Sequence, residues 1–286
     1  MAKCAFLGLG VMGAPMARHL LARDNAVTVW NRTDSKASGF AAAHPGSQAA
    51  ASPAEAIADA DFVFLCLGDD PDVGAVVSAM APAIREGQVI ADHTTASAGL
   101  ARRLWDVAHA RGAGFIDAPV SGGQAGAENG QLTVMCGGEA RDFDRAEPVM
   151  RAYARQITLI GGVGSGQLAK SVNQICIAGI VQGLSEGLHF ARRNGLDEAK
   201  VIEAISAGAA QSWQMQNRWR TMVEGRFDFG FAVDWMRKDL RIALEAARTT
   251  GASLPLTALV DQFYADIQAD GHGRWDTSSL ISRLRG

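Results

Sequence analysis

Along roughly the first 160 residues, short apolar runs alternate with stretches in which apolar residues recur at helical spacing. The apolar runs predict strands at Lys3–Gly8, Val27–Trp30, Phe62–Leu67, Val89–Asp92, Gly114–Asp117, Leu132–Cys136 and Ile157–Ile160. The intervening patterns predict helices that include Ala14–Ala22, Asp34–Ala43, Ser97–Arg111 and Ala140–Tyr153. Such alternation is typical of an α/β fold, a doubly wound parallel sheet of the Rossmann type with helices on its faces.

The pattern changes at the glycine-rich segment Gly161–Gly166, after which the β-rich runs disappear. The next segment, Gln167 to Asn194, is an unusually long and mostly apolar helical pattern that stops at Gly195. Further helices are predicted at Leu196–Ala207, Ser212–Val223, Phe231–Thr250 and Leu254–Ala269. We therefore predict two domains, a Rossmann domain over residues 1–163 and an all-α C-terminal domain over residues 164–286 that begins with a long inter-domain helix.

The long helix has apolar residues on more than one face, which indicates burial between domains or subunits. We expect the chain to form a homo-oligomer, a dimer or a tetramer, through its helical domain.

Composition supports a globular protein and narrows its partners. The 286 residues suit two domains, and 48% apolar residues, 20% charged residues and a net charge of -3 offer no basic excess for nucleic acid. The four cysteines stand far apart without a C-x-x-C pair, so we expect small buried hydrophobic residues and no metal site. Neither a signal peptide pattern nor a membrane-length apolar run is visible, which predicts a cytoplasmic protein without a membrane partner.

The motif Gly8-Leu9-Gly10-Val11-Met12-Gly13 joins the first strand to the first helix. Because the chain contains 32 glycines, about 0.4 matches to this glycine spacing are expected by chance, so the spacing alone is weak evidence. The order of strand, motif, helix and second strand is stronger evidence, because it completes a dinucleotide-binding unit. Gly8 would permit the turn, Gly10 the approach of a pyrophosphate, and Gly13 the close packing of helix on strand. The alternative is a purely structural glycine turn.

A second glycine pattern, Gly164-Ser165-Gly166-Gln167-Leu168-Ala169, also follows a strand. No second strand follows its helix, so no dinucleotide unit closes around it. We interpret it as a hinge between the domains.

The residues after the second strand, Asn31-Arg32-Thr33, bear on the choice of cofactor. An acidic residue there would bind the ribose hydroxyl of NAD, whereas an arginine with neutral donors suits the 2′-phosphate of NADP. We therefore expect NADP(H) to be preferred and NAD(H) to remain possible. The alternative is a surface turn in which Thr33 caps the helix Asp34–Ala43.

Two further segments carry candidate chemistry. In Asp117-Ala118-Pro119-Val120-Ser121-Gly122-Gly123, a hydroxyl followed by two unhindered N–H groups at a strand end could hold a substrate carboxylate, or could form an ordinary turn. In Lys170-Ser171-Val172-Asn173, an ammonium and a carboxamide share one helix face among apolar residues. Removal of a lysine from water favours its neutral form, which suits acid/base catalysis. Lys238 lies on an amphipathic helix, where a solvated lysine is the commoner outcome.

Together these motifs resemble the β-hydroxyacid dehydrogenase family, which includes 3-hydroxyisobutyrate dehydrogenase and tartronate semialdehyde reductase. The likeness covers essentially the whole chain and rests on four segments: Phe6–Gly13, Asp117–Gly123, Gly161-x-x-Gly164-x-Gly166-x-x-x-Lys170-x-x-Asn173 and Lys238-Asp239-Leu240.

The resemblance implies that Lys170 exchanges a proton with the substrate hydroxyl or carbonyl oxygen while hydride passes to or from the nicotinamide. It assigns the substrate carboxylate to Ser121, Gly122 and Gly123, and it gives Asn173 a positioning role. It further implies that Lys238 lines the pocket and that residues at Leu67, Thr95 and Lys238 contact the cofactor. Many relatives carry a second asparagine where this chain has Gln174, a departure that bears on substrate shape.

The expected function is an NADP(H)-dependent oxidoreductase for a small β- or γ-hydroxy acid and its semialdehyde, of the 3-hydroxyisobutyrate, tartronate semialdehyde or succinic semialdehyde type. One alternative is an imine reductase-like enzyme of the same superfamily, although those enzymes typically replace the lysine found at Lys170. The other is a dinucleotide-binding scaffold without catalysis. The related 6-phosphogluconate dehydrogenases have a histidine where this chain has Val172, which disfavours decarboxylation of a sugar phosphate.

Overall fold

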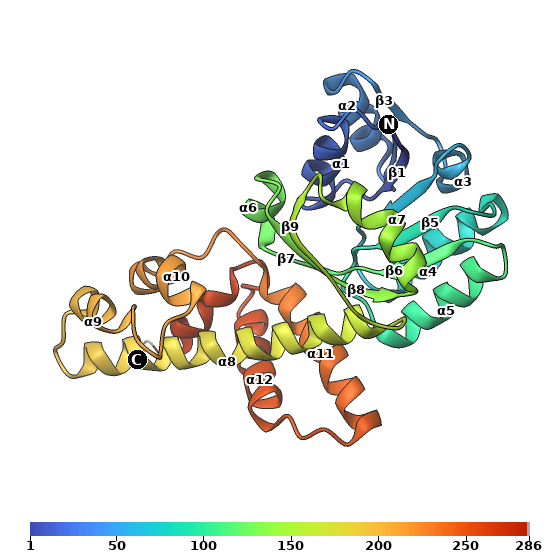
Figure 1. The fold of residues 1–286 in the computed structure, drawn as a ribbon. Helices are drawn as coiled ribbons and strands as arrows, with labels where there is room; N and C mark the ends of the chain where they lie inside the picture. The colour runs from blue at the N-terminus through green and yellow to red at the C-terminus, as the bar shows by residue number, and fades with distance from the viewer. Residues whose placement is uncertain (285–286) are drawn as a thin grey trace. The chain divides into compact units, whose positions relative to one another are not determined.

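The computed structural model describes residues 1–284 and divides into two compact units (Figure 1). The first unit is Met1–Lys170 and the second begins at Ser171. The change between them falls inside helix α8, Ser165–Arg193, a few residues beyond the boundary at 163 and 164 that the sequence predicts.

The first unit contains a mixed sheet in which, over the described residues, nine strands are joined. The strands are β1 Lys3–Leu7, β2 Ala26–Trp30, β3 Ser47–Ala49, β4 Phe62–Leu65, β5 Val89–Asp92, β6 Gly114–Asp117, β7 Val120–Ser121, β8 Leu132–Gly138 and β9 Ala154–Gly161. Their order is β3-β2-β1-β4-β5-β6-β8-β7, with β9 paired to β8. Strands β1 to β6 are parallel, and β8 runs antiparallel to β6 and β7. The predicted Rossmann-type sheet is confirmed.

Helices cover both faces of this sheet because its strands are apolar on both sides (Figure 1). In β1, Phe6 belongs to one core cluster and Leu7 to the other, as the alternation of side chains along a strand requires. The helices of this unit are α1 Gly13–Leu21, α2 Asp34–Ala43, α3 Pro53–Ile57, α4 Asp70–Met80, α5 Ala98–His109, α6 Gly123–Glu128 and α7 Ala140–Met150. Buried residues of α1, α2 and α7 pack in the first cluster, and those of α3, α4 and α5 pack in the second.

The second unit is helical, as predicted. Beyond α8 it contains α9 Glu198–Ile205, α10 Trp213–Glu224, α11 Val233–Thr250, α12 Pro255–Ala269 and a 3-10 helix, η2 Thr277–Leu284. Its described β structure is limited to one isolated bridge between Ala232 and Asp276. Helix α8 ends before Gly195, whose φ of 72° is the left-handed conformation that stops a helix.

Side-chain caps explain why several helices begin one or two residues later than the periodicity predicts. Ser97 accepts a hydrogen bond from the Leu100 N–H at the start of α5, and Ser212 accepts one from Met215 at the start of α10. Asp197 does the same for α9. A cap residue lies outside the helix, so an apolar pattern alone does not separate it from the first turn.

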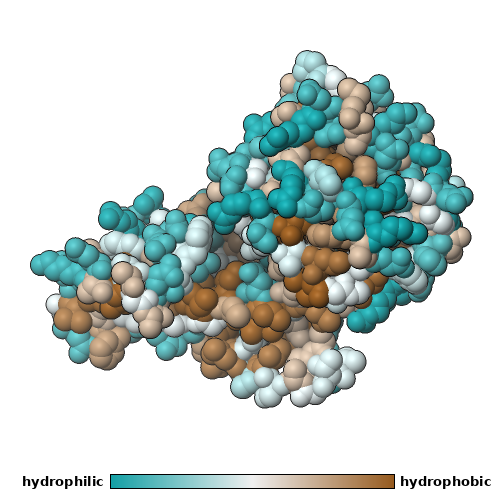
Figure 2. Space-filling view, viewed as in Figure 1, coloured by the Kyte–Doolittle hydropathy of each residue, from teal (hydrophilic) through white to brown (hydrophobic). Residues whose placement is uncertain are grey.

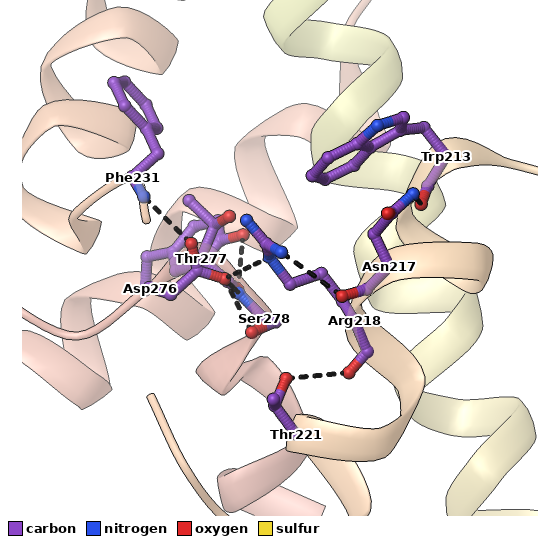
Figure 3. Close-up of polar contacts among 9 residues, drawn as sticks. Trp213, Asn217, Arg218, Thr221, Phe231, Asp276, Thr277 and Ser278 are labelled. Carbon is purple, nitrogen blue, oxygen red and sulfur yellow. Dashed lines mark hydrogen bonds and ion pairs between the residues drawn. The ribbon is translucent and has the colours of Figure 1, made fainter. Parts of the chain in front are cut away.

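Asp276 fixes the C-terminal segment of the helical unit (Figure 3). Its buried carboxylate accepts hydrogen bonds from the N–H of Phe231 at 2.9 Å and from the N–H and Oγ of Ser278 at 3.0 and 2.6 Å. The Nε of Arg218 lies 3.5 Å from the same carboxylate, and its guanidinium lies 4.7 Å from the ring centre of Trp213. These contacts join η2 to α10 and to the segment that enters α11.

The outer face of α8 is apolar and exposed. Val172 is 60% exposed, Phe190 is 67% exposed, and Ile180 and Cys176 lie on the same side. Figure 2 shows brown, apolar residues among polar ones over the region of α8 and α12. The exposure of Cys176 contradicts the expectation that all four cysteines are buried. Self-association through this unit stays a prediction, which light scattering would measure.

A hollow of about 630 Å³ lies beside the C-terminal half of α8. It is lined by Gly183, Glu186, Gly187, His189, Phe190, Arg193 and Leu284. The sequence predicts no site residue there, and the candidate chemistry described below lies elsewhere. Among the described residues, every helix is too short or too polar to cross a bilayer.

One histidine forms part of the core of the first unit. His93 is 2% exposed, and its Nδ1 lies 2.7 Å from the carbonyl oxygen of Ala118. Because a carbonyl only accepts, Nδ1 donates this bond and Nε2 accepts from the hydroxyl of Tyr153 at 2.9 Å. Burial lowers the pKa of His93 to about 4. The ring is therefore neutral at physiological pH and ties the strand end at Ala118 to the core.

We expect His93 to make the fold sensitive to acid. Its pKa is about 4 in the folded protein and 6.5 in the unfolded chain, so between these values the unfolded state binds the proton more readily. The stabilisation is complete above pH 6.5 and is lost as the pH falls toward 4. Urea unfolding should show that the wild type loses about 2 kcal/mol more stability between pH 7 and pH 5 than His93→Gln, which keeps a donor and an acceptor but does not titrate. Equal losses in the two proteins would contradict the expectation.

Candidate active site

The glycine motif between β1 and α1 contains glycines of two kinds. A Cβ on Gly8 would lie 2.2 Å from the carbonyl oxygen of Cys66, and one on Gly13 would lie 1.9 Å from the carbonyl oxygen of Gly8. Gly8 also has a φ of 105°. A Cβ on Gly10 meets nothing within 4 Å. The fold therefore requires Gly8 and Gly13, whereas Gly10 leaves open space at the turn.

The start of α1 suits an anion. Met12, its N-cap residue, makes no side-chain cap, and the first turn contains no acidic residue. Because the first N–H groups of a helix have no partners within it and the macrodipole is positive there, this end favours a phosphate. Val11 is 67% exposed and Leu9 is buried, so the motif runs from the core to the surface. The open position at Gly10 and the uncapped helix both fit a dinucleotide pyrophosphate.

The three residues after β2 differ in their contacts. The Asn31 side chain supports the glycine motif, since its Oδ1 accepts from the Leu9 N–H at 2.9 Å. Arg32 is exposed, and its Nη1 lies 2.8 Å from Oδ1 of Asp72 in α4. Thr33 is the N-cap residue of α2, which spans Asp34–Ala43 as the alternative interpretation expects, but its side chain makes no capping hydrogen bond. Arg32 thus presents a cation at the strand end where a cofactor ribose is expected.

Leu67 and Thr95 follow the neighbouring strands β4 and β5. The Leu67 N–H donates to Oγ1 of Thr94 at 2.9 Å, which joins the two loops. Gln167 of α8 donates from Nε2 to the Thr94 carbonyl at 2.7 Å, and its Oε1 accepts from the Ala96 N–H at 3.0 Å. In a parallel sheet the carboxyl ends of adjacent strands share one edge, so these loops lie on the same edge as the glycine motif.

Asp117 connects the end of β6 to the start of α8. It is fully buried, and its carboxylate accepts from the Gly164 N–H at 2.7 Å and the Gln167 N–H at 2.9 Å. Burial raises the pKa of Asp117 to about 6, an effect that these backbone donors oppose. A Cβ on Gly166 would lie 2.4 Å from the Met135 carbonyl oxygen, so the glycines of this second motif permit close packing. A carboxylate from a distant strand thus anchors the first turn of α8.

Lys170 follows on the same helix and is only 6% exposed. Its predicted removal from water is confirmed. No sequence pattern singles out Gln167, and Asp117 was predicted only as part of a substrate-binding motif. Both proved to hold the first turn of the helix that bears Lys170.

Ser121, Gly122 and Gly123 lie where β7 leads into α6. Gly122 has a φ of 129° and Gly123 a φ of 61°, conformations that side-chain-bearing residues rarely adopt. A Cβ on Gly123 would meet nothing within 4 Å, and both glycines are exposed. The backbone here is open to a ligand, and the binding of a substrate carboxylate stays a prediction.

The remaining candidates belong to the helical unit. Lys238 of α11 has a side chain only 12% exposed, with its Nζ 3.2 Å from Oδ1 of Asp239 and 5.7 Å from the ring centre of Trp235. Lys238 is therefore not on a solvated helix face. Asn173 of α8 donates from Nδ2 to Oε1 of Gln174 at 2.8 Å. No cluster of three or more histidine, cysteine or acidic side chains within residues 1–284 is arranged to hold a metal ion.

Comparisons with known proteins cover both units. Residues 3–161 match the family model described as the NAD binding domain of 6-phosphogluconate dehydrogenase. Residues 164–284 match that described as NAD-binding of NADP-dependent 3-hydroxyisobutyrate dehydrogenase.

Individual proteins match over nearly their full lengths. An uncharacterized oxidoreductase of Shewanella frigidimarina is 56% identical over 99% of this chain and 98% of its own. The 2-hydroxy-3-oxopropionate reductase of Escherichia coli is 32% identical over 99% and 97%. The structure of Mycobacterium tuberculosis 3-hydroxyisobutyrate dehydrogenase with L-serine is similar with a TM-score of 0.92 and 33% identity, and it covers 100% of both chains.

The two kinds of glycine give a test of the dinucleotide site. Gly10→Ala should fold normally because its Cβ has space, yet weaken NADPH binding by about tenfold or more because the methyl group occupies the approach of the pyrophosphate. Gly13→Ala should instead lower the unfolding temperature, since its Cβ would clash with the Gly8 carbonyl. Thermal unfolding and titration of NADPH fluorescence measure the two effects.

Gly39→Ala, in the exposed part of α2 and also without neighbours within 4 Å, is the matched control and should change neither property for the worse. Wild-type affinity for NADPH in Gly10→Ala would show that the motif does not bind the dinucleotide.

Proposed function

Because this chain belongs to the β-hydroxyacid dehydrogenase family, we propose that it interconverts a small β- or γ-hydroxy acid and its semialdehyde with a preference for NADP(H). The coarser description, an NAD(P)-dependent oxidoreductase that acts on a CH–OH group, follows from the family. The observation that carries the finer proposal is a buried lysine, Lys170, on a helix anchored to the sheet edge that bears the glycine motif.

The residues of the first unit fit the cofactor. Gly10 and the uncapped start of α1 would hold the pyrophosphate, and Asn31 keeps the motif in place through the Leu9 N–H. Leu67 and Thr95 would contact the cofactor from the neighbouring loops. When bound, the nicotinamide supplies or accepts the hydride.

Lys170 supplies the acid/base step. In oxidation it takes the proton of the substrate hydroxyl, and in reduction it returns a proton to the carbonyl oxygen. The N–H groups of Gly122 and Gly123 and the Ser121 hydroxyl would bind the substrate carboxylate, because open backbone donors in left-handed conformations form an anion cradle. Asn173 positions the reacting group, and Lys238 contributes a largely buried cation for the substrate and cofactor.

NADP preference rests on Arg32. Its exposed guanidinium lies 2.8 Å from Asp72 just after β2, and it offers donors that a 2′-phosphate can engage bidentately. An acidic residue, which would repel that phosphate and bind the ribose hydroxyl of NAD, is absent from Asn31-Arg32-Thr33.

The central experiment mixes purified protein and NADPH with tartronate semialdehyde, methylmalonate semialdehyde and succinic semialdehyde. We expect NADPH absorbance to fall with at least one of them. Lys170→Met should reduce kcat by about 10²–10⁴-fold without changing the Kd for NADPH, because the general acid is lost while the dinucleotide site remains. Lys200→Met, an exposed lysine on α9, is the matched control and should retain wild-type kcat.

Two results would count against the proposal. No turnover of the panel at high enzyme concentration would oppose the substrate class and favour a scaffold. Full activity in Lys170→Met would overturn the acid/base role while leaving the oxidoreductase assignment intact.

The cofactor preference has its own variant. Arg32→Ala should raise the KM for NADPH about tenfold and leave the KM for NADH nearly unchanged, because only the phosphate contact is removed. Arg23→Ala, an exposed arginine after α1, should leave both constants as they are. An equal change for the two cofactors in Arg32→Ala would mean that Arg32 does not recognise the phosphate.

A further inference from the structure

Three polar side chains of the helical unit form a directed series of hydrogen bonds. Asn173 donates from Nδ2 to Oε1 of Gln174 at 2.8 Å, and Gln174 donates from Nε2 to Oδ2 of Asp239 at 2.7 Å. Gln174 and Asp239 are each only 2% exposed. The first two residues lie on α8 and the third on α11, 65 positions further along the chain than Gln174.

The direction of the series is set by its charged end. Lys238 places its Nζ 3.2 Å from Oδ1 of Asp239, and the two side chains form an ion pair of an ammonium and a carboxylate. An ionised carboxylate can only accept hydrogen bonds, so Gln174 must turn its amide nitrogen toward Asp239. The Gln174 oxygen then faces Asn173, and Asn173 must donate to it. The oxygen of the Asn173 amide consequently lies on the side away from Gln174.

Packing alone does not account for these residues. Apolar residues also pack in this part of the helical core: the Met236 sulfur lies 3.8 Å from Nε2 of Gln174, and Met236 and Leu240 of α11 are fully buried. When apolar side chains of similar volume replace a buried polar pair, the protein is often at least as stable as before. A connected series of hydrogen bonds with only one possible direction has a different effect. It restricts the orientation of the side chain at its end, here Asn173.

We propose that Gln174 and Asp239 are positioning residues that fix the Asn173 amide with its oxygen available as an acceptor. This inference rests on the proposed function and adds a substrate feature to it. Because Lys170 takes the hydrogen of the reacting hydroxyl, the substrate group that donates to Oδ1 of Asn173 is a second donor, a hydroxyl other than the one that is oxidised. Gln174 acts through Asn173 and does not bind the substrate itself.

Two substitutions at Gln174 separate orientation from packing. Gln174→Met keeps a similar volume but cannot bridge Asn173 and Asp239, so kcat should fall about tenfold while the Kd for NADPH is unchanged. In Gln174→Glu, the new side chain can make the hydrogen bonds of glutamine only when it is protonated. Its hydroxyl then donates to Asp239, and its carbonyl oxygen accepts from Asn173. Its activity should approach the wild-type value at low pH and decline as the new carboxyl ionises, in a step that the wild-type profile lacks.

The matched control is Gln182→Met. Gln182 is a buried glutamine of the same helix, but it lies about two turns of helix beyond Gln174 and donates to Oε1 of Glu186. It should retain the wild-type kcat and pH profile.

A second measurement does not depend on turnover. In protein labelled at asparagine with an NMR-active nitrogen isotope, the Asn173 side-chain signal is identified by its absence in Asn173→Ala. The signal should shift, and its hydrogen exchange should accelerate, in Gln174→Met but not in Gln182→Met.

The outcomes distinguish the two proposals. If the wild type reduces none of the semialdehydes, the proposed function fails while the NMR comparison still decides the orientation of Asn173. If the Asn173 signal and kcat are both unchanged in folded Gln174→Met, the positioning role is overturned. The same conclusion follows if Gln174→Glu has the wild-type pH profile.

Discussion

The hydrogen bonds that the buried carboxylate of Asp117 accepts are the interaction on which the geometry of the candidate site depends. It comes from the end of β6 and accepts hydrogen bonds from two N–H groups at the beginning of α8, Gly164 and Gln167. A negative charge at a helix N-terminus is favourable because it opposes the macrodipole and uses donors that lack partners within the helix. Through this contact the helix that bears Lys170 starts at a fixed point on the sheet, and Gln167 adds a second attachment to the loop after β5.

Close contact between backbones is the second constraint, and it explains two glycine patterns of equal spacing. At Gly8 and Gly13 the chain packs on itself so that α1 can follow β1. At Gly166 the same freedom from a Cβ lets α8 approach β8 and β6. In the first pattern, Gly10 instead combines open space with a helix start that has no side-chain cap. Equal sequence patterns therefore have different uses, and the space around each glycine distinguishes a dinucleotide site from a packing contact.

Buried polar groups in both units show how a neighbouring acceptor decides which atoms of an amide or an imidazole donate hydrogen bonds and which accept them. The Ala118 carbonyl makes His93 donate from Nδ1, and so the Tyr153 hydroxyl donates to Nε2. The Asp239 carboxylate imposes a corresponding order on Gln174 and Asn173. In each case a group that can only accept determines the orientation of the groups beyond it. The family relationship gives the type of reaction, and these local constraints bear on which atoms the chain offers to its substrate.

Features that depend on local patterns could be predicted from the order of residues alone. Apolar runs identified the parallel strands, the order of strand, glycine motif and helix identified the dinucleotide unit, and Gly195 marked the end of the long helix. Strands β3 and β7, with three and two residues, were missed because they are too short to show a period. Other features became visible only from the three-dimensional contacts: Asn31 bonds the glycine motif, Cys176 is exposed, Asp117 and Gln167 bond the start of α8 to the sheet, and Gln174 bonds both Asn173 and Asp239. These roles depend on contacts between segments tens of residues apart, and side-chain direction in such contacts is set by the packing of whole elements and leaves no periodic signal in the chain.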